Sequence, residues 1–252
     1  MYWMQLRRSQ IDACDRRTPV IIPTAAVEQH GEHLPVGTDC MINRALTDRL
    51  VQAMEGRLLV MPMVQVTCSE HHMVWPGSLT LTHETYSRTV MEYVDAVQRN
   101  GFKRVMVLNS HGGNQAINAV LDQKIGQRYQ DVECLVGSWW NIAGTSIQPM
   151  SEGEGLSCGH ACEFETSMIL AVAEELVDMT KAEDGGNPQR VDSMNFDLFG
   201  GGVASSYQDY KEATHNGVFG KPTLASAEKG ERILAAAVQS IQELIESFWK
   251  DV

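Results

Sequence analysis

The sequence lacks the features that mark membrane proteins and disulfide-stabilised secreted domains. No uninterrupted apolar run approaches the length of about 20 residues that a membrane helix needs. Residues 1–17 mix arginine and aspartate with few apolar residues, so no secretory signal is visible. The six cysteines are scattered through a chain that is long enough to build its own hydrophobic core. The fold therefore needs no disulfide framework for its stability. We therefore expect a cytoplasmic protein with reduced thiols.

Positive charge is scarce as well. The chain has 20 lysines and arginines against 32 aspartates and glutamates, a formal net charge of −12 at pH 7. Phosphate backbones and anionic lipids are bound by clustered positive charge. We therefore expect neither a nucleic acid nor a membrane as partner, and a small molecule as substrate. The 252 residues, 43% of them hydrophobic, are enough for one large core, so we expect one domain over residues 1–252.

Short apolar runs and longer segments with helical spacing alternate along the chain. The apolar runs lack polar alternation, which predicts strands buried on both faces, at residues 19–26, 58–67, 104–109 and 132–138. Apolar residues recur at intervals of three and four in residues 41–54, 83–100, 115–129, 164–175 and 227–248, which predicts helices. This order indicates an α/β fold with a mainly parallel sheet covered on both faces. Residues 183–204, rich in Gly, Asn and Asp, are interpreted as a long surface excursion.

Side chains that can bind metal or line an active site follow three of the predicted strands. Glu28 and His30 come directly after the first strand, His111 follows the third, and Trp139 and Trp140 follow the fourth. In an open α/β sheet the ligand crevice lies outside the carboxyl ends of the strands. We therefore expect these segments, which are distant in the sequence, to meet in one cleft.

The residues around this cleft suggest a metal site. Asp39 stands at the expected start of the next helix, and its two oxygens could serve two ions at once. Mixed His and carboxylate ligands suit Zn²⁺, Mn²⁺ or Fe²⁺ better than Ca²⁺. Purely structural explanations exist, because Asp39 could cap the helix and His111 could be a hydrogen-bonded loop residue. Gly112 and Gly113 could cradle a phosphate or let the backbone turn.

A second group of candidate ligands surrounds His160. Cys158 and Cys162 flank it and Glu163 follows, which raises the alternatives of a thiolate zinc site and of a cysteine nucleophile paired with His160. Only two such cysteines occur here, without a second pair, and nothing in the sequence marks either thiol as activated. We therefore favour the site of His and carboxylate ligands.

Four motifs give the chain a resemblance to the creatininase (creatinine amidohydrolase) family. They occur in the family's order over roughly residues 15–175. The motifs are Glu28-Gln29-His30-Gly31 with Leu34-Pro35 and Asp39; Ser69-Glu70-His71 with Trp75-Pro76-Gly77-Ser78-Leu79-Thr80-Leu81; Asn109-Ser110-His111-Gly112-Gly113-Asn114; and His160-Ala161-Cys162-Glu163-Phe164-Glu165-Thr166-Ser167.

The resemblance implies a three-layer α/β/α sandwich with a mostly parallel sheet, two divalent ions at the strand ends, and a homo-oligomer, often a hexamer. Carried over by motif, Glu28 and His111 are ligands of one ion, His30 is a ligand of the other, and Asp39 bridges both. Creatininase carries a Glu where this chain has Gly113. Members with two glycines there have a Glu in the His-Ala-x-Glu motif, so Glu163 is expected as the fifth ligand, with Glu165 as its rival.

The two-glycine pattern also bears on the substrate. Members with it include formamido-pyrimidine deformylases, a peptidase of redox-cofactor maturation and a hydrolase that opens a diketo-inositol ring, so creatinine is not the favoured substrate. His160 matches the family's catalytic His and Trp140 an active-site Trp, while Ser78 and His71 lie in a loop that borders the substrate pocket.

We accordingly expect a divalent-metal-dependent hydrolase. A metal-bridged hydroxide would attack a carbonyl of a small, cyclic substrate, which is a cyclic amide, a formamide or a cyclic diketone. His160 would donate a proton to the leaving group, unless it only orients Glu163. The rival classes are a metal-dependent sugar isomerase or lyase, which would exchange a carbon-bound proton, and a metal-stabilised binding module without activity.

Overall fold

A parallel sheet of four strands forms the centre of the molecule. The computed structural model describes residues 1–153, 158–186, 197–199, 207 and 209–250. The strands are β1 (Val20–Thr24), β2 (Leu59–Val60), β3 (Arg104–Asn109) and β4 (Glu133–Ser138). Their order across the sheet is β2-β1-β3-β4, and every pair is parallel.

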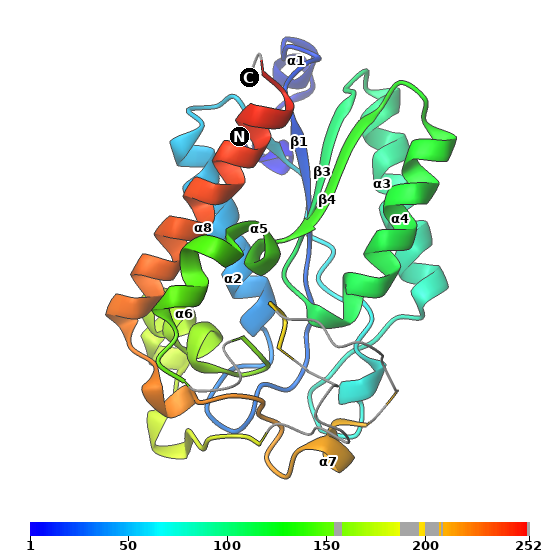
Figure 1. Cartoon of the computed structure of the whole chain (residues 1–252). Helices are drawn as coiled ribbons and strands as arrows, with labels where there is room; N and C mark the ends of the chain where they lie inside the picture. The colour runs from blue at the N-terminus through cyan, green and yellow to red at the C-terminus, as the bar shows by residue number, and fades with distance from the viewer. Residues whose placement is uncertain (154–157, 187–196, 200–206, 208, 251–252) are drawn as a thin grey trace.

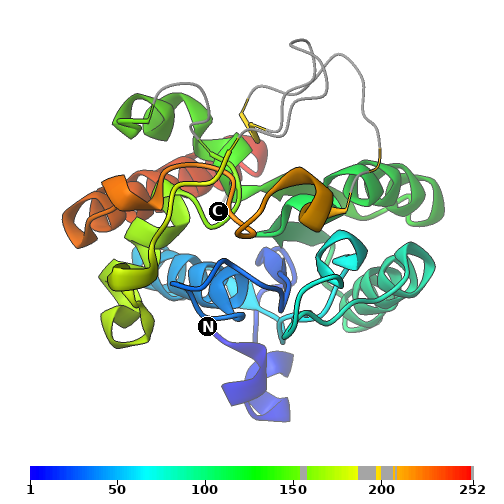
Figure 2. The same cartoon turned by 90° about the horizontal axis from the view of Figure 1, so that it is seen from below.

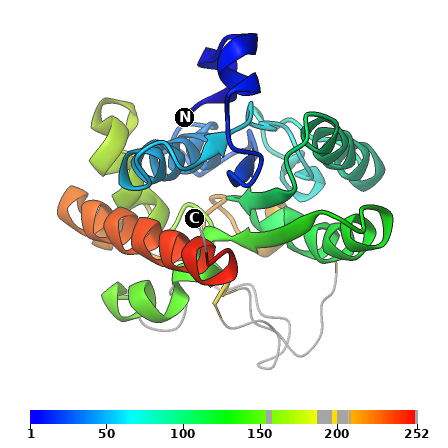
Figure 3. The ribbon, with the colours of Figure 1, turned by 90° about the horizontal axis from the view of Figure 1, so that it is seen from above.

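Helices cover both faces of this sheet (Figures 1 and 3). One layer consists of α2 (Thr38–Ala53), α5 (Trp139–Ile147), α6 (Glu163–Ala173) and α8 (Ala227–Phe248), and the other of α3 (His83–Arg99) and α4 (Gln115–Arg128). Two short helices, α1 (Arg8–Asp12) and α7 (Tyr210–Ala213), lie at opposite ends of the molecule in Figure 1. The predicted three-layer α/β/α sandwich with a parallel sheet is thus confirmed.

The central strand β1 shows why its sequence has no polar alternation. Its five residues are all buried. Ile21 packs in the same cluster as Leu46 of α2, whereas Val20 and Ile22 pack on the other face in a cluster with Val97 of α3. Because successive side chains of a strand point to opposite faces, a strand between two helical layers must be apolar at every position.

Some element boundaries differ from the sequence-based prediction. In the apolar run 58–67 only Leu59–Val60 forms a strand, because Pro62 lacks the N–H that a continued ladder needs, although Val64 still bridges Thr24. Helix α5 was not predicted, since no polar break separates it from β4. Most of the expected excursion at 183–204 lies outside the described residues.

All four strands end at the same edge of the sheet, as the parallel topology requires. Figure 2 views the molecule from this end, onto the loops that follow the strands and onto α7. The loops after β1 and β3 and the helix after β4 carry candidate site residues at this end. In the described part of the chain no helix combines the length and the apolar character that crossing a membrane requires.

Helices α6 and α8 approach each other closely at Gly230. A Cβ atom at this position would lie 1.9 Å from the main-chain oxygen of Ser167 and 3.0 Å from Cβ of Ala171. We predict that Gly230→Ala lowers the free energy of unfolding by about 1–3 kcal/mol, because the backbones must separate to admit the methyl group.

Gly126 in α4 offers a matched control for Gly230. It is exposed, and a Cβ there would have no atom within 4 Å. Gly126→Ala should stabilise the protein by about 0.5–1 kcal/mol, since alanine has the higher helix propensity. Urea denaturation measures both changes, and equal effects of the two substitutions would contradict the close helix contact.

Candidate metal centre

Two loops and one helix bring four of the predicted ligands together. Glu28 and His30 lie in the loop after β1, His111 follows β3, and Asp39 lies in the first turn of α2. None of the four is more than 2% exposed. Asp39 does not cap its helix, because the N-cap position is Gly37 and no side chain makes a cap bond there.

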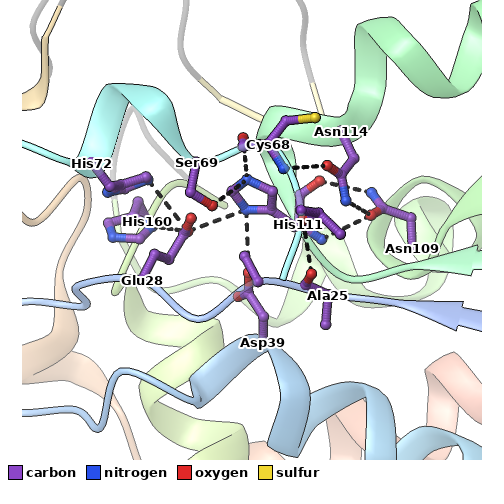
Figure 4. A network of polar contacts seen from close by, with 12 residues as sticks. Ala25, Glu28, Asp39, Cys68, Ser69, His72, Asn109, His111, Asn114 and His160 are labelled. Carbon is purple, nitrogen blue, oxygen red and sulfur yellow. Dashed lines mark hydrogen bonds and ion pairs between the residues drawn. The ribbon is translucent and has the colours of Figure 1, made fainter. Parts of the chain in front are cut away.

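Asp39 stands between the two histidines. Its Oδ1 lies 3.2 Å from Nε2 of His30, and its Oδ2 lies 3.2 Å from Nδ1 of His111. The same Nδ1 is 3.2 Å from Oε1 of Glu28, so the His111 ring sits between the two carboxylates (Figure 4). One carboxylate thus presents one oxygen to each of two imidazoles, which is the arrangement that a bridging ligand requires.

Main-chain carbonyls orient both imidazole rings. Nδ1 of His30 lies 3.1 Å from the main-chain oxygen of Glu28, and Nε2 of His111 lies 3.0 Å from that of Cys68. A carbonyl only accepts, so in the neutral imidazole each of these nitrogens carries the hydrogen. The opposite nitrogen then presents its lone pair to the carboxylates. This second hydrogen bond is the usual way in which proteins fix a metal-binding histidine.

Burial and charge act against each other on the titrating groups of this cluster. Burial raises the pKa of Glu28. Burial would lower the pKa of His111, but the Glu28 and Asp39 carboxylates outweigh it and raise that pKa to about 10. Burial would also lower the pKa of His30, but the Asp39 and Glu165 carboxylates raise it well above its usual value. The neighbouring His111 and His30 imidazoles outweigh the burial of Asp39 and lower its pKa. The cluster is therefore negative in character and stabilises cations.

Several buried polar atoms in this cluster have no hydrogen-bond partner among the residues that the structure describes. They are Oε2 of Glu28, Nε2 of His30, Oδ2 of Asp39 and Oε2 of Glu165. Buried polar atoms are normally satisfied, so four orphans in one place indicate a missing partner. All four are nitrogen or oxygen atoms that can serve as metal ligands, and such ligands fit Zn²⁺, Mn²⁺ or Fe²⁺. No described cysteine belongs to a group that could hold a metal ion, in contrast to the thiolate alternative.

The choice of the fifth ligand changes from Glu163 to Glu165. Glu163 turns away from the cluster, and its carboxylate accepts hydrogen bonds from Lys229 Nζ and from the main chain at Glu152 and Gly153. Glu165 Oε1 instead lies 3.9 Å from Nε2 of His30. Both residues are in the first turn of α6, and residues two apart on a helix face different directions, so only one of them can reach the cluster.

His72 is the site residue that the sequence did not single out. Its Nε2 lies 3.3 Å from Oε1 of Glu28, and the ring is 1% exposed. His71, the predicted pocket residue, also lines the cavity, where burial and then the charge of His111 lower its pKa to about 3. Ser78 does not line the cavity among the described residues; its hydroxyl accepts the main-chain N–H of Gln29 at 3.0 Å and supports that loop.

His160 and Trp140 lie where the sequence places them, at the cluster and its cavity. Nδ1 of His160 is 3.6 Å from Oε1 of Glu28, and an antiparallel bridge to Phe219 holds its backbone with hydrogen bonds of 2.9 and 2.8 Å. Burial, followed by the charge of His30, lowers the pKa of His160 well below its usual value. The indole N–H of Trp140 is buried without a partner.

A cavity of about 610 Å³ opens above these residues. The described part of its lining contains no lysine and no arginine. Trp140, Tyr210 and Phe219 contribute aromatic wall, and the Tyr210 ring centroid lies 4.0 Å from that of His72. The volume suits a small organic molecule that reaches the carboxylate cluster from one side.

Gly113 leaves no room for a side chain beside this cavity. A Cβ atom there would lie 2.4 Å from Nε2 of His111 and 2.4 Å from the main-chain oxygen of Cys68. These are the two atoms of the hydrogen bond that orients the His111 ring. The glycine is thus a geometric requirement of this ligand arrangement.

Comparisons with known proteins agree with this geometry. The family model described as creatinine amidohydrolase matches residues 4–245. The chain is 28% identical to creatinine amidohydrolase of Pseudomonas putida, over 90% of this chain and 88% of that protein. It is 29% identical to the mycofactocin precursor peptide peptidase of Mycobacterium ulcerans, with 87% and 81% covered. Its identity to the 3-dehydro-scyllo-inosose hydrolase of Thermotoga maritima is 24%, with 96% and 80% covered.

Solved structures extend the likeness to the fold. A crystal structure of creatininase superposes with a TM-score of 0.80 at 26% identity, covering 98% of this chain and 96% of that one. A mutant creatininase of the Zn-Zn type gives 0.77 at 25% identity, with 98% and 97% covered. The chain therefore belongs to the creatininase family, and it is a metal-dependent hydrolase with a buried site for divalent ions.

Proposed function

We propose that this protein hydrolyses a carbonyl group of a small, cyclic substrate with two divalent ions held by Glu28, His30, Asp39, His111 and Glu165. The observation that carries the proposal is the placement of Asp39, with one oxygen 3.2 Å from His30 and the other 3.2 Å from His111. Glu28 and His111 would complete one ion's protein ligands, and His30 and Glu165 those of the other. Glu165 replaces Glu163, whose carboxylate is engaged by Lys229.

Two such ions, when bound, supply a water of lowered pKa and a Lewis acid for the substrate oxygen. The remaining chemistry falls to the chain itself. His160 transfers the proton between the water and the leaving group, because burial keeps its pKa low and its ring borders the cluster. Trp140 walls the cavity and excludes bulk water, and its unpaired indole N–H is available to a substrate acceptor.

The substrate class follows from the cavity and the relatives. The described lining has no lysine or arginine to pair with a carboxylate or phosphate, which favours uncharged substrates. Cyclic amides, formamides and cyclic diketones are small, uncharged and bear an electrophilic carbonyl. The relatives that act on creatinine and on an inosose fall within these classes. We propose a homo-oligomer, a hexamer by the family resemblance, and sedimentation would measure its size.

The experiment that tests this function is a hydrolysis screen of zinc-loaded and manganese-loaded protein over the three substrate types, with creatinine included. Reaction in water labelled with heavy oxygen should place the label in the product. A sugar isomerase would instead exchange a carbon-bound proton without taking up the label. Failure on every substrate would favour the binding-module alternative.

The first prediction here concerns the shared ligand. Asp39→Ala should lose both ions and all activity, because both half-sites use this carboxylate, whereas His111→Ala should retain part of the metal. Asp48→Ala is the control, since Asp48 lies on the same helix and its carboxylate is bonded to Tyr2 and Arg44. Elemental analysis after dialysis measures the content, and two ions retained in Asp39→Ala would rule out a bridging role.

The second prediction separates the two glutamates of α6. Glu165→Gln should weaken one of two metal sites in a titration. Glu163→Gln should keep both sites but lower the free energy of unfolding by about 3 kcal/mol, because Lys229, only 5% exposed, loses a charged partner. The opposite pattern would restore Glu163 as the ligand.

The third prediction concerns His160. His160→Ala should keep both ions and lower turnover of the substrate identified in the screen by about 10²–10⁴-fold, the usual scale of general acid–base catalysis. His215→Ala is the control, because His215 is 67% exposed and bonded to Glu183 on the surface. Loss of metal from His160→Ala would make His160 a ligand.

A further inference from the structure

Gln29 lies between the two metal-site residues of its loop and contacts two histidines of the cavity. Its side chain is 6% exposed. The amide nitrogen Nε2 lies 3.1 Å from Nδ1 of His72, 3.1 Å from Nε2 of His160 and 3.0 Å from the main-chain oxygen of Gly217. Nothing in the proposed function above uses this residue.

The orientation of the Gln29 amide is fixed by two main-chain groups. Oε1 accepts the N–H of Gly31 at 2.9 Å, so the oxygen must point to that side. Nε2 then faces the carbonyl of Gly217, which only accepts. Gly217 has a φ of +76°, and a Cβ there would lie 2.2 Å from Oε1. The backbone thus holds the amide in one orientation, and the two hydrogens on Nε2 remain to be assigned to acceptors.

The hydrogens can be assigned from donor and acceptor chemistry alone. Nε2 of His160 lies 2.6 Å from the main-chain oxygen of Gln29 and must donate to it. The same nitrogen therefore cannot accept a hydrogen from the Gln29 amide. One amide hydrogen goes to Gly217, so the other goes to Nδ1 of His72.

We propose that Gln29 is a positioning residue that sets the protonation of both histidines: its carbonyl keeps the hydrogen of His160 on Nε2, and its amide keeps that of His72 on Nε2. The hydrogen of His72 then lies on Nε2, which is 3.3 Å from Oε1 of Glu28, and Oε2 of Glu28 is left for a cation. His160 presents the bare Nδ1 to the cluster, 3.6 Å from Oε1 of Glu28.

This assignment deepens the proposed function and rests on it for its catalytic meaning. With Nδ1 bare, His160 enters the reaction as a proton acceptor. As the water oxygen bonds to the carbonyl carbon, an O–H bond breaks and the proton moves to Nδ1. It then passes to the leaving atom as the bond between that atom and the carbonyl carbon breaks. His160 thus still donates the proton to the leaving group, as expected from the sequence, after first accepting it from the water.

Nitrogen NMR of zinc-loaded, full-length protein with isotope-labelled histidines tests the assignment, because it distinguishes protonated from bare ring nitrogens. Signals are assigned by their loss in His72→Asn and His160→Asn. In the native protein both residues should show a proton on Nε2 and none on Nδ1. In Gln29→Met, which removes the amide but keeps the chain length, His72 should become a mixture of tautomers while His160 keeps its proton on Nε2.

His33 is the internal control, because its Nε2 contacts Thr166 at 3.0 Å and its ring has no contact with the Gln29 amide. Its signals should not move in Gln29→Met. A proton on Nδ1 of His160 in the native spectrum would overturn the proposal even if the variant fails to fold. An unchanged His72 in a folded Gln29→Met would overturn the role of the side chain. These spectra require no turnover, so their result is separate from the outcome of the substrate screen.

Discussion

Three carboxylates are buried beside one another in this protein, and the rest of the site follows from the need to neutralise them. Glu28, Asp39 and Glu165 are 1%, 2% and 8% exposed. Removing an ionised carboxylate from water costs several kcal/mol unless positive charge and hydrogen bonds compensate for it. The two histidines, each fixed by a carbonyl, supply part of that compensation, and divalent ions supply the rest. Folding and metal binding are therefore coupled in this protein.

The parallel sheet is what makes this concentration of charge possible. Glu28, Asp39 and His111 come from segments far apart in the chain, and they meet because β1 and β3 end at the same edge. Strands β1 and β3 pack apolar side chains against both helical layers, so they provide a rigid base. The loops can then hold buried polar side chains, because the packing of the core offsets the free-energy cost of burying them.

The sequence predicted the general location of the site and missed the details that depend on side-chain direction. Strand ends and helix order can be read from apolar periodicity, and they placed Glu28, His30, Asp39 and His111 correctly in one cluster. The sequence-based choice of Glu163 as the fifth ligand stays a prediction. In the structure Glu165 faces the cluster and Glu163 contacts Lys229, and spacing alone does not reveal which side of α6 faces the cluster. His72 was overlooked beside His71, since motif spacing does not say that both adjacent rings turn toward the cavity. Lys229, which engages Glu163, lies too far along the chain for any local pattern to reveal it.

The crowded surroundings of Gly113 bear on how this family diversifies. A glutamate at this position, as creatininase has, needs space that the Cys68 carbonyl and the His111 ring occupy here. Substituting Gly113 by glutamate alone would therefore disturb the His111 ring and the Cys68 carbonyl that orients it. Admitting a side chain here requires the segment around Cys68 to move away from Gly113. A crystal structure of creatininase superposes on this chain with a TM-score of 0.80, so the choice of residue at this one position calls for a local backbone change within a shared fold.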